Sequence, residues 1–311
     1  MGECATDDDD ATDDDDAADD DDAADDDDAA DDDDAADDDD AADDDDATEP
    51  TTCSHGDTVV GPAFDGPFGE QTYDFRCVQP GTFTMGSPKG HPEADDDETP
   101  HEVTLTRGLL AAQFEVPIGL YVDVIEDDPT NCPDCTDAHP VHSVSFRRSW
   151  VFANALSERE GLDPAYVEVI DDVFQDLDAT GYRIPTEAEW EYLAWGGQDF
   201  DYGSTDDPDL VGWCDDRSAS EPHLVGLLQP NGYGMYDMVG NVGEWVWDKY
   251  DDYPLGPVTD PTGPVDAFHR VRRGGDYFDP CDWARPPSRS FDTDAGSQYR
   301  GFRVVRTVLV D

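Results

Sequence analysis

A cluster of thiols and imidazoles lies near the middle of the chain. Cys132 and Cys135 are separated by two residues, and His139 and His142 follow them closely. Thiolate and imidazole groups at this spacing are the ligands of a tetrahedral Cys2His2 zinc site. The same two cysteines are equally suited to a local disulfide in a surface loop. Both interpretations stay open from these residues alone.

The chain contains seven cysteines, of which Cys4 stands apart from six in the body. An even set of six in one folded domain indicates disulfides and an oxidising, extracytoplasmic compartment. Cys53 and Cys77 flank a loop at the start of the body, which predicts one disulfide between them.

Other candidate catalytic groups match no known arrangement. The seven histidines are scattered and follow no order of nucleophile, base and acid. Glu187, Glu189 and Glu191 could be paired carboxylates, but alternate spacing on a helix turns them to different faces. Helix capping and core hydrogen bonding are therefore expected of these glutamates, and no catalytic residue is predicted.

The charge of the chain excludes some partners. Among its 311 residues, 79 are acidic and 17 are basic, which gives a net charge of −62. Thirty of the acidic residues precede Thr51, so the remaining body is itself strongly negative. Such a surface repels nucleic acid and anionic membranes. No run of 18 apolar residues occurs, so no membrane span is predicted.

Residues 1–50 are predicted to form a disordered, Asp-rich tether. Seven Asp-Asp-Asp-Asp blocks repel one another, and no aromatic or branched apolar residue is available for a core. Cys4 directly before the tether resembles the mature start of a bacterial lipoprotein. We therefore expect a lipid anchor at Cys4, a cell-envelope or secreted location, and membrane contact only through that anchor. A short myristoylation pattern at Gly2 is the alternative.

The elements that must position these residues form a body over 51–311. Thr186 is predicted to cap a helix, with Glu189 as the partner in a capping box. The periodicity predicts strands at 81–87, 101–106, 109–116 and 142–146, helices at 117–125 and 147–160, and short strands near Trp245, Val271 and Phe302. The pattern is that of an α+β domain with abundant loop.

Four blocks of sequence carry a family resemblance, at Gly181–Tyr192, Asn231–Trp245, Arg270–Gly275 and Arg300–Arg303. In this order they closely resemble the formylglycine-generating-enzyme, or sulfatase-modifying factor, family. The resemblance extends over about residues 78–307. It implies an irregular α+β fold related to C-type lectins.

The resemblance also implies where a copper ion would bind. Active members hold copper between two cysteines, five residues apart, just after an Arg-Gly-Gly-Ser block. Aligned on Gly274 and Gly275, the serine position is Asp276, and the two cysteine positions are Asp279 and Ala284. Cuprous copper needs soft thiolate ligands. Copper is therefore not expected, and neither is the oxidase activity.

The remaining cysteines are interpreted through the same resemblance. Cys281 lies near the copper positions but alone and out of register, so it cannot supply a thiolate pair. The fold would bring Cys214 close to it, which implies a disulfide between the two. The resemblance also places His142 in an extended segment that would separate it from His139, which argues against zinc.

A calcium ion is implied in the second block. Its ligands would be the side chains of Asp237 and Glu244 and the carbonyl groups of Gly240 and Val242. Carboxylates and free carbonyls in a glycine-containing loop suit this hard cation. Gly243 replaces a tryptophan that is common in the family, so looser packing is expected there.

The segment Asp276–Tyr299 is implied to line the substrate groove. Lectin-like proteins diversified by retroelements use the same stretch as their variable ligand face. Trp283 and Arg289 could instead be buried structural residues. The residues predicted to contact a ligand are Asp276, Tyr277, Phe278, Asp279, Trp283, Arg285 and Arg289.

The predicted function is therefore that of an exported, non-catalytic family member. It would bind a peptide, a protein or a glycan at its C-terminal groove. One alternative is an enzyme with a different, non-copper oxidative chemistry on the same scaffold. Another is a retroelement-diversified, lectin-like binding protein.

Overall fold

The computed structural model describes residues 52–66, 69–170, 172–295 and 297–310. Contacts divide the chain into Met1–Ala47 and Thr48–Asp311, and the described residues all belong to the second unit. The predicted tether and the predicted anchor at Cys4 lie outside the described residues.

A six-stranded sheet runs through the centre of the second unit, in the order β1-β19-β8-β5-β2, with β11 also paired to β19. Its strands are β1 (Thr52–Cys53), β2 (Thr58–Val59), β5 (Phe75–Val78), β8 (Gly108–Ala112), β11 (Tyr182–Arg183) and β19 (Val305–Val310). Strand β8 is buried throughout and pairs antiparallel with both β5 and β19. Because alternate residues face opposite sides, Leu110 joins one core, whereas Leu109 and Ala111 join another.

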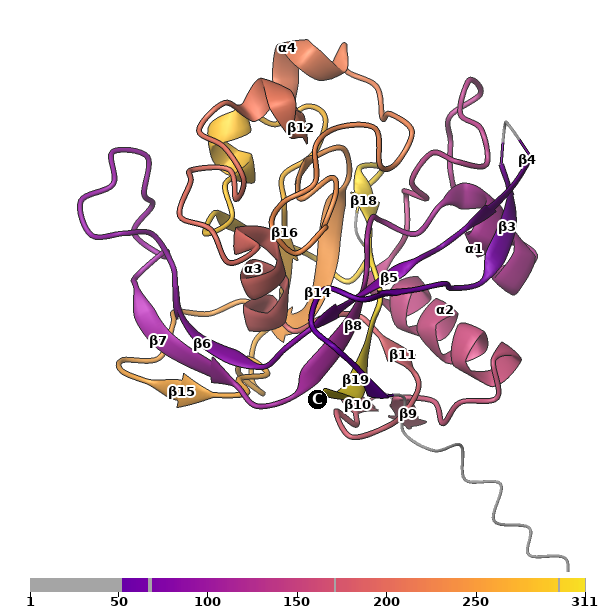
Figure 1. Ribbon diagram of the computed structural model, residues 1–311, viewed down its shortest axis with the longest axis horizontal. Helices are drawn as coiled ribbons and strands as arrows, with labels where there is room; N and C mark the ends of the chain where they lie inside the picture. The colour runs from indigo at the N-terminus through magenta and orange to yellow at the C-terminus, as the bar shows by residue number, and fades with distance from the viewer. Residues whose placement is uncertain (1–51, 67–68, 171, 296, 311) are drawn as a thin grey trace, which may run out of the picture. The chain divides into compact units, whose positions relative to one another are not determined.

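The first core lies between this sheet and the helices α1 (Ile118–Ile125) and α2 (Phe146–Arg159). Figure 1 shows the two helices side by side, away from α3. Tyr121 of α1 stacks on Phe152 of α2 with ring centroids 5.3 Å apart. Ser145 caps α2 by accepting a hydrogen bond from the backbone N–H of Arg148.

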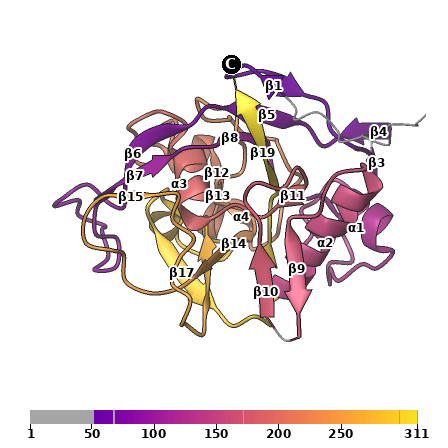
Figure 2. The same cartoon turned by 90° about the horizontal axis from the view of Figure 1, so that it is seen from below.

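The second core lies against α3 (Glu187–Trp195), which Figure 2 shows on the opposite side of β8 from α1 and α2. Trp190 and Leu193 pack there with Leu109 of the sheet. The predicted capping box is confirmed. The side chain of Thr186 accepts a hydrogen bond from the backbone N–H of Glu189, and the side chain of Glu189 accepts one from the backbone N–H of Thr186. The helix ends at Gly196, in the left-handed conformation.

Smaller sheets surround this centre. A four-stranded sheet has the order β17-β16-β14-β18, a three-stranded sheet has the order β15-β7-β6, and three further strand pairs are β3–β4, β9–β10 and β12–β13. Their bounds are β3 (Ala63–Gly66), β4 (Gly69–Thr72), β6 (Gly81–Met85), β7 (His101–Leu105), β9 (Tyr166–Val169), β10 (Asp172–Gln175), β12 (Gly212–Trp213), β13 (Val239–Gly240), β14 (Gly243–Lys249), β15 (Val258–Thr259), β16 (Arg270–Arg273), β17 (Arg289–Asp292) and β18 (Arg300–Gly301). A short helix, α4 (Asp215–Ser218), and two 3-10 turns, η1 (Pro208–Leu210) and η2 (Cys281–Ala284), complete the elements.

The predicted α+β class is confirmed, and so are the helices at 117–125 and 147–160 to within a residue. The strand predicted at 142–146 is wrong. Ser143 adopts a left-handed backbone with φ 61°, and Phe146 already begins α2. The strand predicted at 109–116 begins one residue earlier and ends at Ala112. The β9–β10 hairpin was not predicted.

Candidate functional site

The candidate site is the loop that follows β16. Gly274 and Gly275 both adopt left-handed backbones, with φ 85° and 65°. A side chain at Gly275 would place its Cβ 2.9 Å from the Cβ of Ala284. Two glycines are therefore required to fold the segment from Asp276 to Ala284 back against the end of β16.

The two positions aligned with the copper-binding cysteines hold no sulfur. Asp279 accepts a hydrogen bond from Nη1 of Arg272 at 3.0 Å and another from the backbone N–H of Asp276 at 3.2 Å. Ala284 is completely buried. A carboxylate already paired with a guanidinium, together with a buried methyl group, does not fit a cuprous ion.

All six cysteines within the described ranges are in disulfides. The pairs are Cys53–Cys77, Cys132–Cys135 and Cys214–Cys281. These are the three pairings expected from the sequence, and they indicate an oxidising, extracytoplasmic compartment. The last pair ties η2 in the candidate site to the residue that precedes α4.

The disulfide between Cys132 and Cys135 decides against the zinc interpretation. His139 instead accepts a hydrogen bond through Nδ1 from the backbone N–H of Thr136 at 2.9 Å. Burial lowers the pKa of His139 and of His142. Within the described ranges, no group of three or more His, Cys, Asp or Glu side chains is arranged to hold a metal ion.

Two aromatic rings of this loop, Tyr277 and Phe278, contact the ring of Tyr299, which directly precedes β18, and we call these three residues the aromatic cluster. Their ring centroids lie 5.0 to 5.4 Å apart. Tyr277 is buried, whereas the ring of Phe278, which packs on it, is 49% exposed. Trp283 on η2 presents a further ring that is 58% exposed. Exposed, rigidly held rings are typical anchors of binding surfaces.

Ion pairs hold the backbone beneath the aromatic cluster. Asp276 accepts from Nη1 of Arg300 at 2.7 Å, and Arg300 also donates to Asp292 at 3.2 Å. Arg300 fills the space beside Gly243, because its Nη1 lies 2.9 Å from the position of a Cβ there. Looser packing was expected at Gly243, but the guanidinium group of Arg300 fills the space there.

Arg285 and Arg289 are buried away from the exposed rings. Arg285 pairs with Glu98 at 3.0 Å, and Arg289 makes two hydrogen bonds of 2.8 Å with Glu187 of α3. Of the seven residues predicted to contact a ligand, only Phe278 and Trp283 present largely exposed side chains, and the others support the loop.

The loop predicted to hold calcium brings Asp237 and Glu244 into one buried region. Both oxygens of Glu244 accept from Arg303, at 2.7 and 2.6 Å, and Oε2 also accepts from the indole N–H of Trp190. Glu244 is therefore already neutralised by a guanidinium group. As a complete set, the four predicted ligands do not fit a calcium ion in this arrangement.

Asp237 differs from Glu244, because its Oδ1 is buried and has no hydrogen-bond partner among the described residues. Its Oδ2 accepts from the backbone N–H of Gly226 at 2.6 Å. Burial raises the pKa of Asp237 to about 6. Both oxygens of the nearby Glu115 are also buried and lack hydrogen-bond partners in the described ranges. Burial, followed by the charge of Asp237, raises the pKa of Glu115 well above its usual range. A cation would gain most at these two carboxyl groups.

Comparison with known proteins identifies the family. The family described as the sulfatase-modifying factor enzyme 1-like domain matches residues 67–308. This chain belongs to that family.

Relatives of the sulfatase-modifying factor family carry different names. "Chaperone protein LppX" of Paenibacillus barcinonensis is 30% identical over 246 residues, which cover 66% of this chain and 82% of that protein. A formylglycine-generating enzyme of Mycobacterium tuberculosis is 28% identical over 289 residues, covering 72% of this chain and 95% of the enzyme. The solved structure of Treponema denticola variable protein 1 is 25% identical, has a TM-score of 0.71, and covers 80% of this chain and 98% of that one.

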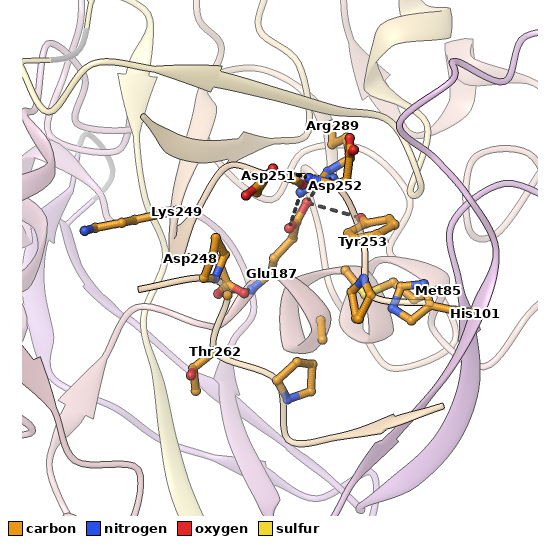
Figure 3. A pocket seen from close by; sticks show the side chains of 15 residues that line it. Met85, His101, Glu187, Asp248, Lys249, Asp251, Asp252, Tyr253, Thr262 and Arg289 are labelled. Atoms are coloured by element: carbon orange, nitrogen blue, oxygen red, sulfur yellow. Dashed lines mark hydrogen bonds and ion pairs between the residues drawn. The ribbon is translucent and has the colours of Figure 1, made fainter. Parts of the chain in front are cut away.

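Two features of this family member escaped sequence reasoning. Glu187 and Glu191 of α3 pair with Arg289 and Arg273, which lie far along the chain and which no local pattern reveals. Glu189 pairs with Arg183, six residues before it. A pocket near the start of α3 (Figure 3) is lined by residues of α3, of several strands and of the loops around β15, and the four prolines between 254 and 264 were its only sequence signal. In the part of the chain that the structure describes, no helix has the length and apolar character needed to cross a membrane.

Proposed function

We propose that this chain is a non-catalytic member of the sulfatase-modifying factor family that binds polypeptide segments at the aromatic cluster. Two observations support the loss of the oxidase. Asp279 and Ala284 stand at the thiolate positions, and Cys281 is held in a disulfide with Cys214. The family's copper chemistry needs a thiolate pair that these positions do not supply.

The aromatic cluster is the observation that carries the binding role. The exposed ring of Phe278 packs on Tyr277 and Tyr299, and the backbone beneath is fixed by the Asp276–Arg300 pair. A ring that is ordered before binding loses little conformational entropy when a ligand arrives. The cluster also lies where the family resemblance implies a substrate groove.

Polypeptide is favoured over glycan for two reasons. A relative that shares 30% of its residues over most of its length is called a chaperone protein. The strongly acidic body also attracts basic, unfolded segments through long-range electrostatics. Nucleic acid is disfavoured by the same charge.

The binding proposal is tested with reduced, carbamidomethylated lysozyme, a basic and permanently unfolded polypeptide. Fluorescence anisotropy of the labelled probe is expected to report saturable binding to the full chain. Phe278→Ala combined with Trp283→Ala should weaken the affinity by roughly tenfold or more, as removal of aromatic anchors does. The matched control is Phe174→Ala, which removes a ring that is 58% exposed on β10.

The outcomes separate the alternatives. Equal binding by the double variant and the parent protein would contradict the proposal. Binding of a neutral polysaccharide such as dextran, with no binding of unfolded lysozyme, would favour a glycan ligand instead. A peptide containing Cys-x-Pro-x-Arg should remain unconverted with copper and oxygen, and aldehyde formation above a blank would overturn the non-catalytic assignment.

We also propose that the protein acts outside the cytoplasm and is tethered by a lipid at Cys4. The three disulfides support the compartment. Metabolic labelling with an alkynyl fatty acid should modify the parent chain and not Cys4→Ser. Equal labelling of both would place the lipid elsewhere, and no labelling of either would contradict the anchor.

A further inference from the structure

A pocket of about 340 Å³ opens beside the start of α3, apart from the aromatic cluster. Its floor includes Glu187 and Ala188 of α3 and Asp248 of β14. The loops before and after β15 supply its walls, with Tyr253, Pro254, Pro261 and Pro264. Figure 3 shows these elements converging around Asp248 and Glu187.

The walls suit an alkyl chain. Met85 and Ala188 are almost completely buried beneath the opening, and the rings of His101 and Tyr253 lie 4.7 Å apart at one side. Proline rings cover the other side and offer no backbone N–H donors. An unbranched hydrocarbon stem would bury apolar surface here without leaving hydrogen-bonding groups unsatisfied.

The floor of the pocket holds one carboxyl group more than its guanidinium groups neutralise. Glu187 is paired with Arg289 through two hydrogen bonds of 2.8 Å, and it also accepts from the hydroxyl of Tyr253 at 3.2 Å. The neighbouring Arg273 is bound to Glu191. Among the residues that the structure describes, Asp248 has no such partner and accepts only from the backbone N–H of Glu187, through Oδ2 at 2.8 Å.

The other charged groups around Asp248 do not correct this imbalance. Glu189 adds negative charge from α3, and the positive charges of Arg289 and Arg270 act on Asp248 without contacting its carboxyl group. Lys249 donates to the carbonyl of Val265 at 2.6 Å, and Figure 3 shows its side chain extending away from the pocket. Asp251 and Asp252 at the rim are exposed and add further negative charge.

We propose that this pocket binds an alkylammonium group, with the ammonium on Asp248 and the hydrocarbon stem between Met85, Tyr253 and the proline walls. The bound cation would neutralise the surplus carboxyl group, and the apolar walls would exclude smaller hydrated ions such as Na⁺. A free aliphatic amine and the side chain of lysine share this chemistry. The site is independent of the polypeptide binding proposed for the aromatic cluster.

Binding at this site should depend on pH in a defined direction. Burial, followed by the charge of Glu187, raises the pKa of Asp248 to about 8. A primary ammonium has a pKa of about 10.4 and remains charged through that range. The cation must displace the proton of Asp248 below pH 8, so affinity rises with pH until that carboxyl is ionised.

The experiment is a saturation-transfer NMR titration of the full chain with n-butylammonium at physiological ionic strength. Affinity should be roughly tenfold higher at pH 9 than at pH 7, because the ionised fraction of Asp248 increases by about that factor. Asp248→Asn keeps the hydrogen-bond acceptor for Glu187 and should abolish both the pH dependence and the tighter binding. Nα-acetyl-lysine methylamide in a parallel titration separates a lysine side chain from a free amine.

Three controls make the result decisive. The parent chain and Asp248→Asn both contain the acidic N-terminal repeats, so weak binding of the amine to those repeats is the same in the two titrations. Asp252→Asn removes an exposed rim charge and should change affinity by less than about twofold, since such charges are screened. 1-Butanol should bind equally at pH 7 and pH 9.

The proposal is overturned if n-butylammonium binds the parent protein equally at both pH values, or if Asp248→Asn binds as the parent does. Near-UV circular dichroism confirms that the variant is folded. If the variant does not fold, the pH series on the parent protein still tests the proposal.

Discussion

Buried carboxyl groups occur in two settings in this protein, and the difference lies in their partners. Those of the first set face a guanidinium group across a short distance, and they are Glu98, Glu187, Glu189, Glu191, Glu244 and Asp276. Those of the second set have no arginine in contact within the described part of the chain, and they are Glu115, Asp237 and Asp248. Both sets are almost completely excluded from water.

The partner decides what each set contributes. A paired carboxylate and guanidinium fix the elements that carry them, as Glu189 joins α3 to Arg183 of β11. An unpaired buried carboxyl group instead retains its proton to a higher pH or awaits a cation. The first set therefore builds the framework, and the second set marks places where the molecule responds to pH and to ligands.

Breaking a pair of the first set should have the largest effect. Glu189→Ala would leave Arg183 buried without its partner and would also remove the capping box of α3. We expect a loss of about 3–5 kcal/mol in the free energy of unfolding. Urea denaturation of the parent and the variant measures it. A loss below about 1 kcal/mol would show that the paired set is not the framework.

The sequence predicted the capping box of this framework but not the arginine partners of its glutamates. The capping box at Thr186 and Glu189 is local, so spacing alone predicted it correctly. The arginines that pair with α3 come from β11, β16 and β17. Arg183 lies only six residues before Glu189. The contacts of Arg273 and Arg289 depend on how distant strands are brought together, which periodicity does not encode.

The candidate site divides in the same way. Substitution at the thiolate positions can be read from Asp279 and Ala284 once the Gly274–Gly275 turn is recognised. The burial of Arg289 was one of two alternatives left open by the sequence, whereas that of Arg285 was not anticipated, because charged residues in a loop ordinarily suggest an exposed surface. The pocket beside Asp248 likewise depends on the positions of six separate segments of the chain.

Because of the second set, the free energy of unfolding should decrease as the pH rises. The pKa of Asp248 is raised in the native protein to about 8, so between pH 4 and pH 8 the native state holds a proton that the unfolded chain has released. Stability contributed by this group is present below pH 4 and declines as pH rises through that window. The decline is at most about 1.4 kcal/mol per pH unit.

Between pH 6 and pH 8 we expect the parent protein to lose about 2–3 kcal/mol through Asp248. Asp248→Asn should reduce the slope of that part of the curve, while Asp237, whose pKa is raised to about 6, still adds slope at lower pH. Urea denaturation at unit steps of pH provides the measurement. An unchanged slope in the variant would show that Asp248 is ionised throughout.

Calcium offers a smaller test of the second set. An ion at Asp237 would compensate a carboxyl group whose Oδ1 has no partner. We expect chelation to reduce stability by about 1–2 kcal/mol, the value for a ligand at roughly ten to thirty times its dissociation constant. Asp237→Asn should be insensitive to chelator, as judged by its melting temperature. An equal response in both proteins would place the calcium elsewhere, including the acidic repeats.

The smallest effect is expected at an ion pair on the protein surface, where the carboxylate has an arginine partner but is exposed to water. Arg147 and Glu168 lie 2.9 Å apart, with side chains 64% and 43% exposed. Water already solvates both groups, so Glu168→Gln should change the free energy of unfolding by less than about 0.5 kcal/mol. The distance resembles that of the pair between Arg289 and Glu187, at 2.8 Å, so geometry is held nearly constant while burial varies. A loss as large as that of Glu189→Ala would mean that contact alone sets the energy. The expected small change would assign the difference between exposed and framework pairs to the exclusion of water.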